Sequence, residues 1–223
     1  MKSVAVKQNS RLKDPGSAIT HGIGCMLSVL AAPALLEKAA AGRGIPGVVT
    51  LGIFMLSMIL LYGASTLYHS LDVNPGVNRR LRKMDHMMIF ILIAGSYTPV
   101  CTLVMGGRAG TILCTVIWAM ALAGMLIKGI WITCPKWFSS VIYIAMGWLV
   151  VVSFPWLLPV LSKPAFSWLF AGGVIYTVGG IIYALRPTAF DRRHPCFGSH
   201  EIFHLFVMGG SFCHFMMMYL YVA

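Results

Sequence analysis

Seven apolar segments, each long enough to cross a bilayer, take up almost the whole chain. They cover residues 17–39, 46–69, 85–105, 109–131, 138–158, 165–185 and 200–222. Spanning a hydrocarbon core of about 30 Å takes roughly 20 apolar residues. With 58% hydrophobic and only 10% charged residues, the chain cannot form a soluble core beneath a wettable surface. We therefore predict an all-α membrane protein, in which a basic tail of residues 1–16 precedes a seven-transmembrane-helix bundle of residues 17–223.

The distribution of basic residues predicts how this bundle lies in the membrane, because cytoplasmic loops collect lysine and arginine. The tail and the second, fourth and sixth loops carry thirteen of them, and the other loops carry four. We therefore expect a cytoplasmic amino terminus and an external carboxyl terminus. Short membrane loops offer no basic platform for nucleic acid despite the net charge of +11, so the expected partners are membrane lipids. The larger group comprises Lys2, Lys7, Arg11, Lys13, Arg79, Arg80, Arg82, Lys83, Lys128, Lys136, Arg186, Arg192 and Arg193, and the smaller Lys38, Arg43, Arg108 and Lys163.

Histidines recur at helical spacing near the ends of two segments. His200 and His204 are four residues apart and therefore share one helix face. Ser65 and His69 repeat this spacing at the end of the second segment, and Asp85 opens the third. The predicted topology brings all five to the cytoplasmic face from three different helices. Ionisable groups at membrane depth are costly and usually serve an ion or a substrate, so we expect a functional site there.

Three imidazoles from two helices are suited to zinc. A catalytic zinc site has three protein ligands and leaves a fourth position open, and the ligands here would be His69, His200 and His204. Asp85 and Ser65 would then be the catalytic residues that orient a water molecule from outside the ligand shell. Zinc lowers the pKa of bound water and polarises a carbonyl. The arrangement therefore favours hydrolysis of an amide or ester presented from the inner leaflet.

Simpler interpretations exist for single residues. A carboxylate such as Asp85 in the first turn of a helix complements the helix dipole. A lone histidine near a membrane end, such as His21, is interpreted as a hydrogen-bonded packing residue. His214 lies ten residues beyond His204, or about 15 Å along a helix, so it cannot share a metal with that pair.

The fourth to sixth segments are predicted to be scaffold. A stripe of small residues in the sixth segment lets another helix approach closely. The stripe consists of Gly172, Gly173, Gly179 and Gly180.

Several motifs together resemble the hemolysin III family, which belongs with the progestin and adipoQ receptors. The resemblance covers almost all of the chain and implies a seven-helix bundle with a cytoplasmic amino terminus. It also implies a zinc ion held by the three histidines named above, with Asp85 and Ser65 holding the water of the site. The motifs are Thr20-His21-Gly22-Ile23-Gly24, the SxxxH of Ser65 to His69, Asp85-His86, Ile93-Ala94-Gly95-Ser96-Tyr97-Thr98-Pro99, Ala145-Met146-Gly147-Trp148 and the HxxxH of His200 to His204.

The same resemblance suggests a biological setting. Related ceramidases and adiponectin receptors are similar in using this arrangement for lipid amide hydrolysis. Bacterial members look like plasma-membrane proteins that act in membrane lipid homeostasis, and the family name reflects a cytolytic activity. The chain has no long amino-terminal domain of the kind that the receptors carry, which argues against a hormone receptor.

Two other classes of function stay open at this point. In a non-enzymatic regulator of membrane state, zinc would be structural, with four tight protein ligands, of which Asp85 would be the fourth. In a transporter or pore, Asp85, His86 and His214 would form a proton relay.

Overall fold

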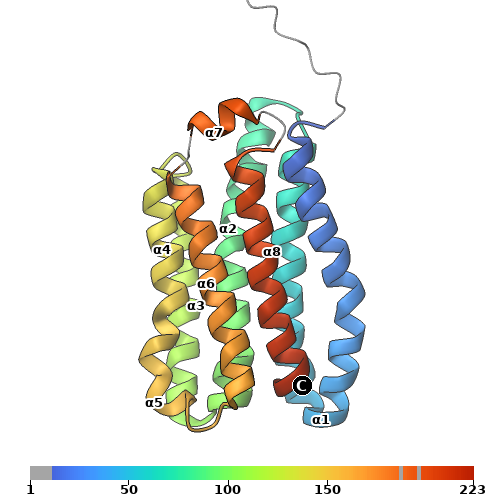
Figure 1. The fold of residues 1–223 in the computed structure, drawn as a ribbon, viewed down its shortest axis with the longest axis vertical. Helices are drawn as coiled ribbons and strands as arrows, with labels where there is room; N and C mark the ends of the chain where they lie inside the picture. Colours follow the sequence, from blue (N-terminus) through green and yellow to red (C-terminus); the bar gives the residue numbers. More distant parts are fainter. Residues whose placement is uncertain (1–11, 186–187, 195–196) are drawn as a thin grey trace, which may run out of the picture.

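The chain folds into a bundle of helices in which the described residues form no strand (Figure 1). The computed structural model describes residues 12–185, 188–194 and 197–223. Six of its helices are long and apolar enough to cross a membrane, which agrees with the predicted all-α membrane class. They are α1 (Pro15–Ser70), α2 (Pro75–Pro99) with a π-helical extension (Val100–Met105), α3 (Gly107–Ile130), α4 (Lys136–Trp148) with a 3-10 stretch (Leu149–Ser153) and α5 (Phe154–Leu157), α6 (Lys163–Leu185), and α8 (Ser199–Met217) with a π-helical end (Met218–Val222).

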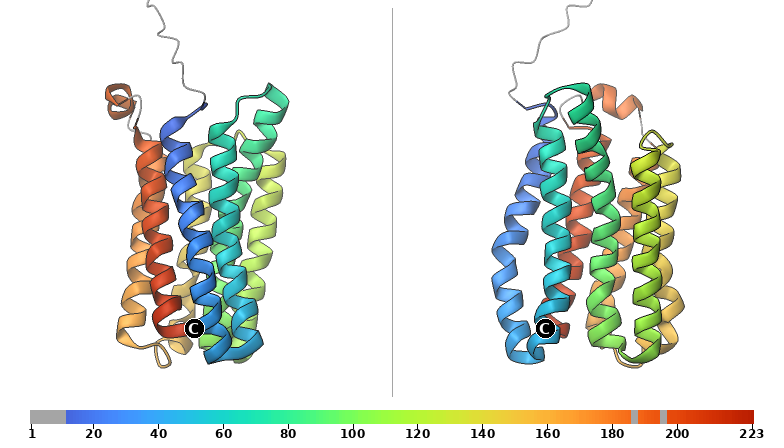
Figure 2. Two further views of the ribbon diagram at one scale, coloured as in Figure 1. Left: turned by 90° about the vertical axis from the view of Figure 1, so that its right-hand side faces the viewer. Right: turned by 180° about the vertical axis from the view of Figure 1, so that it is seen from behind.

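Helix α1 is bent back on itself. Its 56 residues would measure about 84 Å if straight, far more than a hydrocarbon core of about 30 Å. Gly44 interrupts the helix with φ 61° and ψ −151°, a conformation that glycine reaches without steric cost. The two arms then run side by side (Figure 2), and a Cβ on Gly24 would lie 3.2 Å from the ring of Tyr62. The predicted segments 17–39 and 46–69 are the two arms of this hairpin.

Two details differ from the sequence-based prediction. Helix α2 begins at Pro75 and not near residue 85, because Asn74 caps it by accepting a hydrogen bond from the backbone N–H of Val77 at 2.9 Å. Proline in the first helical turn adds to this start signal. The short helix α7 (Thr188–Arg193) was not predicted. Residues 1–11 of the predicted tail, with Lys2, Lys7 and Arg11, lie outside the described residues, and so does Arg186 of the sixth loop.

Glycines allow the helices to approach closely where the sequence predicts it. A Cβ on Gly179 of α6 would lie 2.7 Å from the Cβ of Phe206 on α8, and one on Gly172 would overlap the ring of His214. Gly173, in contrast, faces open space. The predicted stripe of small residues therefore does form part of the contact between α6 and α8.

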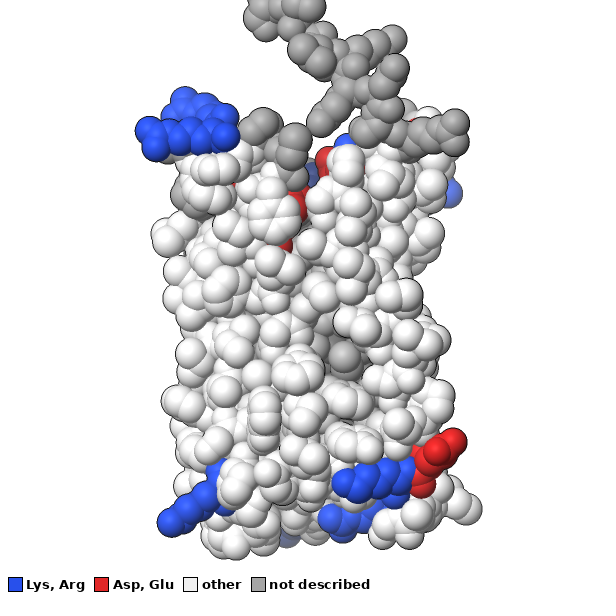
Figure 3. Space-filling view, turned by 45° about the vertical axis from the view of Figure 1, so that its right-hand side comes forward, with Lys and Arg blue, Asp and Glu red and all other residues white. Residues whose placement is uncertain are grey.

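The two ends of the bundle carry different parts of the chain. At the end where α1 bends, Arg43 donates to the backbone carbonyl of Val222 at 2.9 Å, so the carboxyl terminus lies there. At the opposite end, the backbone N–H of Asp14 donates to the carbonyl of His69 at 2.8 Å. Figure 3 shows lysine and arginine gathered at both ends of one face, with an uncharged belt between them. This belt is what a surface facing lipid requires.

A glycine substitution tests the packing of α1 against α2. A Cβ on Gly95 would lie 2.5 Å from the Cβ of Ser57, whereas one on Gly129 meets nothing within 4 Å. Both changes to alanine gain helix propensity, but only Gly95→Ala overpacks a core, at a cost of about 1–3 kcal/mol. We expect Gly95→Ala alone to lower the thermal midpoint of the detergent-purified protein. Equal midpoints for the two variants would contradict this packing.

Candidate metal centre

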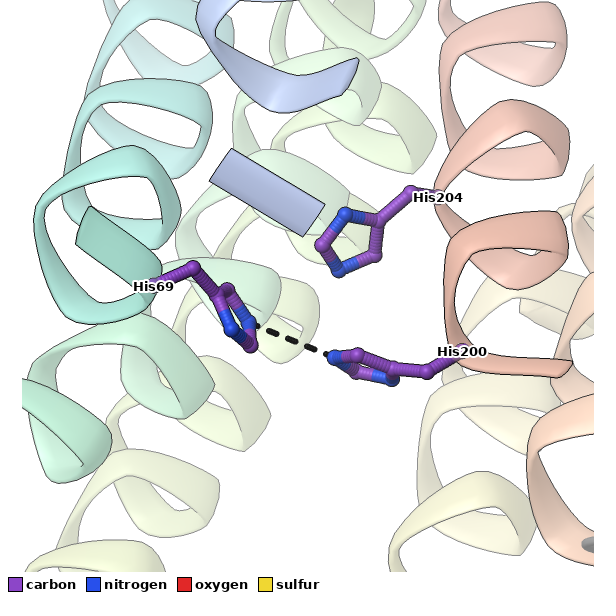
Figure 4. Close-up of side chains that lie close together, drawn as sticks. All are labelled: His69, His200 and His204. Carbon is purple, nitrogen blue, oxygen red and sulfur yellow. Dashed lines mark hydrogen bonds between the residues drawn. The ribbon is translucent and has the colours of Figure 1, made fainter. Parts of the chain in front are cut away.

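Three histidines meet inside the bundle, near the end where α1 begins. His69 comes from the last turn of α1, and His200 and His204 come from the first turns of α8. One ligand nitrogen from each lies within 4.8 Å of the others, so the group can hold a metal ion. In Figure 4 the three rings point toward a common centre. The structure thus brings together the three histidines that the sequence pattern singled out.

The outer nitrogen of His69 is fixed by Asp14. Its Nδ1 lies 3.0 Å from the Asp14 carboxylate, to which it donates a hydrogen bond. This hydrogen bond lowers the pKa of the Asp14 carboxyl below its ordinary value, so the carboxylate is ionised at neutral pH. With the proton held on Nδ1, Nε2 presents a lone pair to the centre. Carboxylate–histidine pairs of this kind orient metal ligands and raise their basicity.

His204 is oriented in the same way by a hydroxyl group. Its Nδ1 lies 3.2 Å from Oγ1 of Thr20. That hydroxyl donates its proton to the backbone carbonyl of Gly16, at 2.9 Å, so it accepts from His204. The Nε2 lone pair of His204 is therefore left for a metal or a ligand.

His200 faces His69 across the centre. Their Nε2 atoms are 3.3 Å apart, and Nδ1 of His200 is buried without a partner among the described residues. Two nitrogens at 2.0–2.1 Å from a tetrahedral zinc ion are about 3.3–3.4 Å apart. The observed separation therefore fits two ligands of one such ion, and two lone pairs at this distance call for a cation or a proton between them.

Hydrogen bonds hold the start of α8 against the start of α1. Ser17 donates to the Glu201 carboxylate at 2.5 Å, and the same carboxylate accepts from the backbone N–H of Gly198 at 2.8 Å. Asp191 of α7 accepts from both the backbone and the hydroxyl of Ser199. The first turn of α8, which carries two of the histidines, is thus fixed from both sides.

Ser65 and Asp85, the two predicted catalytic residues, differ in their hydrogen-bond partners. Ser65 is completely buried one turn before His69, and its hydroxyl has no partner among the described residues. Asp85 is 8% exposed, and its carboxylate lies 3.2 Å from Nδ1 of His86. Asp85 lines the same cavity as the two histidines of α8.

This cavity of about 130 Å³ runs through the bundle between α1, α2, α4, α6 and α8. Its walls are mainly aliphatic and aromatic side chains, among them Leu61, Ile89, Tyr143 and Val207. It extends from the histidine centre to His214, which lies outside the group of potential ligands. The centre therefore opens onto a largely apolar space suited to a hydrocarbon chain.

Sequence reasoning missed the residues of α1 that surround the centre. Neither Asp14 nor Thr20 was predicted to be a site residue. His21 was predicted to be a hydrogen-bonded packing residue. Its ring does stack on that of His204 with 3.6 Å between the centroids, but neither ring nitrogen has a hydrogen-bond partner among the described residues, so the hydrogen-bonded part of that prediction is wrong. Asp14 lies 55 positions from His69 and Thr20 lies 184 from His204. Spacing within one helix carries no signal for such contacts.

The helices and the buried histidines define an integral membrane protein with an internal site that can hold a metal. Residues 9–215 match the family described as haemolysin-III related, and the chain belongs to this family. It is 37% identical to hemolysin-3 of Bacillus cereus over 92% of this chain and 90% of that protein. It is 38% identical to the hemolysin-3 homolog of Bacillus subtilis (strain 168), over 87% of each chain. The adiponectin receptor protein of Drosophila melanogaster is 24% identical over 91% of this chain and 49% of the receptor.

Removing the Asp14 carboxylate tests its role as partner of His69. We expect Asp14→Asn to weaken zinc affinity by about 10 to 100 fold, because loss of such a partner typically has this effect. Competition with a fluorescent chelator measures the affinity. Asp72→Asn is the matched control, since Asp72 is an exposed carboxylate that bonds to Asn78. Unchanged affinity in Asp14→Asn would contradict the assigned partner.

Proposed function

We propose that this protein is a zinc-dependent hydrolase that cleaves an amide or ester bond of a membrane lipid and thereby acts in membrane lipid homeostasis. The observation that carries the proposal is the pair of Nε2 atoms of His69 and His200, 3.3 Å apart beside His204. The family membership and the apolar cavity support it. The relatives in Bacillus make the bacterial plasma membrane the expected location.

In this proposal His69, His200 and His204 would hold the zinc ion and leave room for a water molecule or the substrate. A bound zinc ion lowers the pKa of water to about 7 and polarises a carbonyl. Asp85 would accept a proton from the attacking water as the general base and return it to the leaving amine nitrogen or alcohol oxygen, and the buried hydroxyl of Ser65 would supply a hydrogen bond at the centre. The apolar walls of the cavity bind the acyl chain and exclude bulk water.

We further infer that the chain crosses the membrane seven times, with each arm of α1 as one crossing. The interruption at Gly44 and the side-by-side arms support this count. The amino terminus would then be cytoplasmic and the carboxyl terminus external. Lys83 donates to the carbonyl of Gly129, so the basic start of α2 and the end of α3 lie at the same end of the bundle. The histidine centre would thus lie near the inner leaflet.

Reporter fusions test this topology. Alkaline phosphatase is active only after export, so a fusion after Ala223 is expected to be active and a fusion after Ser70 inactive. Green fluorescent protein at the same two positions should give the reverse pattern. Phosphatase activity after Ser70 but not after Ala223 would show the opposite orientation and contradict the proposed topology.

The hydrolase proposal is tested with purified protein in mixed micelles. Zinc-loaded wild type is expected to release fatty acid from a ceramide or from a lysophosphatidylcholine, as measured by mass spectrometry. Asp85→Asn should keep the zinc but lose about 10²–10⁴-fold in rate, which is the usual contribution of a general base. Asp72→Asn is the control. If the zinc-loaded wild type releases fatty acid from neither lipid, the hydrolase proposal is contradicted.

A second candidate is a non-enzymatic regulator of membrane state, in which zinc staples α1 to α8. The observation that favours it is the contact of the Asp85 carboxylate with Nδ1 of His86 at 3.2 Å. A carboxylate that is already paired with His86 is less available as a general base. Lipid sensing, ion transport and a cytolytic activity all fall within this class. In that case zinc removal would lower the thermal stability, while both lipids stayed intact in the hydrolysis assay.

A further inference from the structure

His21 occupies an unusual position for a residue that only packs. It lies on the first arm of α1, is 3% exposed and lines the cavity beside the histidine centre. Its ring lies parallel to that of His204, with 3.6 Å between the centroids and 6° between the planes. It also makes a T-shaped contact with the ring of Tyr62, with the centroids 5.1 Å apart.

Neither ring nitrogen of His21 has a hydrogen-bond partner among the described residues, although both are buried. A buried polar atom without a partner costs about 1–3 kcal/mol. A phenylalanine would stack on His204 without that cost. The histidine is therefore explained best by a group that enters the cavity and bonds to it.

His21 does not serve as a further ligand of the metal that His204 would bind. A metal lies close to the plane of each imidazole that binds it, because the lone pair lies in that plane. The planes of His21 and His204 are nearly parallel and their ring centroids are 3.6 Å apart, so their lone pairs do not converge on one point. Among the described residues, the group of converging ligand nitrogens contains only His69, His200 and His204.

We propose that His21 binds the carbonyl oxygen of the lipid amide or ester through its imidazole N–H. A neutral imidazole has one donor and one acceptor, and the side chain of His21 lines the cavity. A donor placed beside the open metal position stabilises the negative charge that develops on that oxygen. His21 is thus a substrate-binding residue distinct from the metal ligands and from Asp85, and this inference rests on the proposed function.

The test compares zinc binding with the binding of a carbonyl probe. Hexanohydroxamate chelates zinc through two oxygens, and its six carbons suit a cavity of about 130 Å³. We expect His21→Phe to keep one zinc per chain and a thermal midpoint at least as high as that of wild type. Calorimetry should show hexanohydroxamate binding about tenfold or more weaker, as expected for loss of a hydrogen bond to a charged group.

Two further variants sharpen the comparison. His21→Gln retains an N–H donor and is expected to bind the probe more tightly than His21→Phe. It also provides the measurement if the phenylalanine variant fails to fold. His194→Phe replaces an exposed histidine of the loop after α7 and should leave zinc content and probe affinity unchanged.

The outcomes separate this inference from the proposed function. Unchanged probe affinity in both His21 variants would show that His21 only packs, and would contradict the inference. Loss of zinc in His21→Phe would make it a metal ligand, which also overturns the inference. A wild type that binds neither zinc nor the probe would contradict the proposed function itself, and the role of His21 would fall with it.

Discussion

Three imidazoles buried at one end of an apolar bundle are the constraint on which the site depends. Hydrogen bonds from Nδ1 to Asp14 and Thr20 leave the Nε2 lone pairs of His69 and His204 directed inward. Lone pairs that face one another in a low-dielectric interior repel unless a cation or a proton lies between them. The helix starts are held together by bonds such as Ser17 to Glu201. The bundle therefore maintains a geometry that a bound metal ion would stabilise.

The rest of the fold places this centre at the end of an apolar space. The bend at Gly44 returns α1 along its own first arm, so that Asp14 and His69 come to the same end of the bundle. Close contact of α6 and α8 at Gly172 and Gly179 fixes the helix that carries the other two histidines. The cavity between the helices connects the centre with the bundle interior. A lipid chain could lie there while its polar group meets the histidines, which is the physical basis of the hydrolase proposal.

The sequence predicted the helical class and the histidine centre well, because both depend on short-range periodicity. Segments of about 20 apolar residues mark spans, and spacing of four places His200 and His204 on one face. Loop charge then brought His69 to the same end. The pattern gave no sign of the Asp14 and Thr20 partners, since these contacts join distant parts of the chain. The stacking of His21 on His204 is likewise a tertiary contact, and the start of α2 was set by the Asn74 cap and not by hydropathy.

X-ray absorption at the zinc edge of the purified, zinc-loaded protein tests the central claim most directly. The account predicts a first shell at about 2.0–2.1 Å, with the outer-shell scattering of three imidazoles and one further oxygen. The same spectrum of His204→Ala should lose one imidazole or the metal altogether. A sulfur shell near 2.3 Å, four imidazoles, or no bound zinc in the folded wild type would contradict a three-histidine centre with an open position.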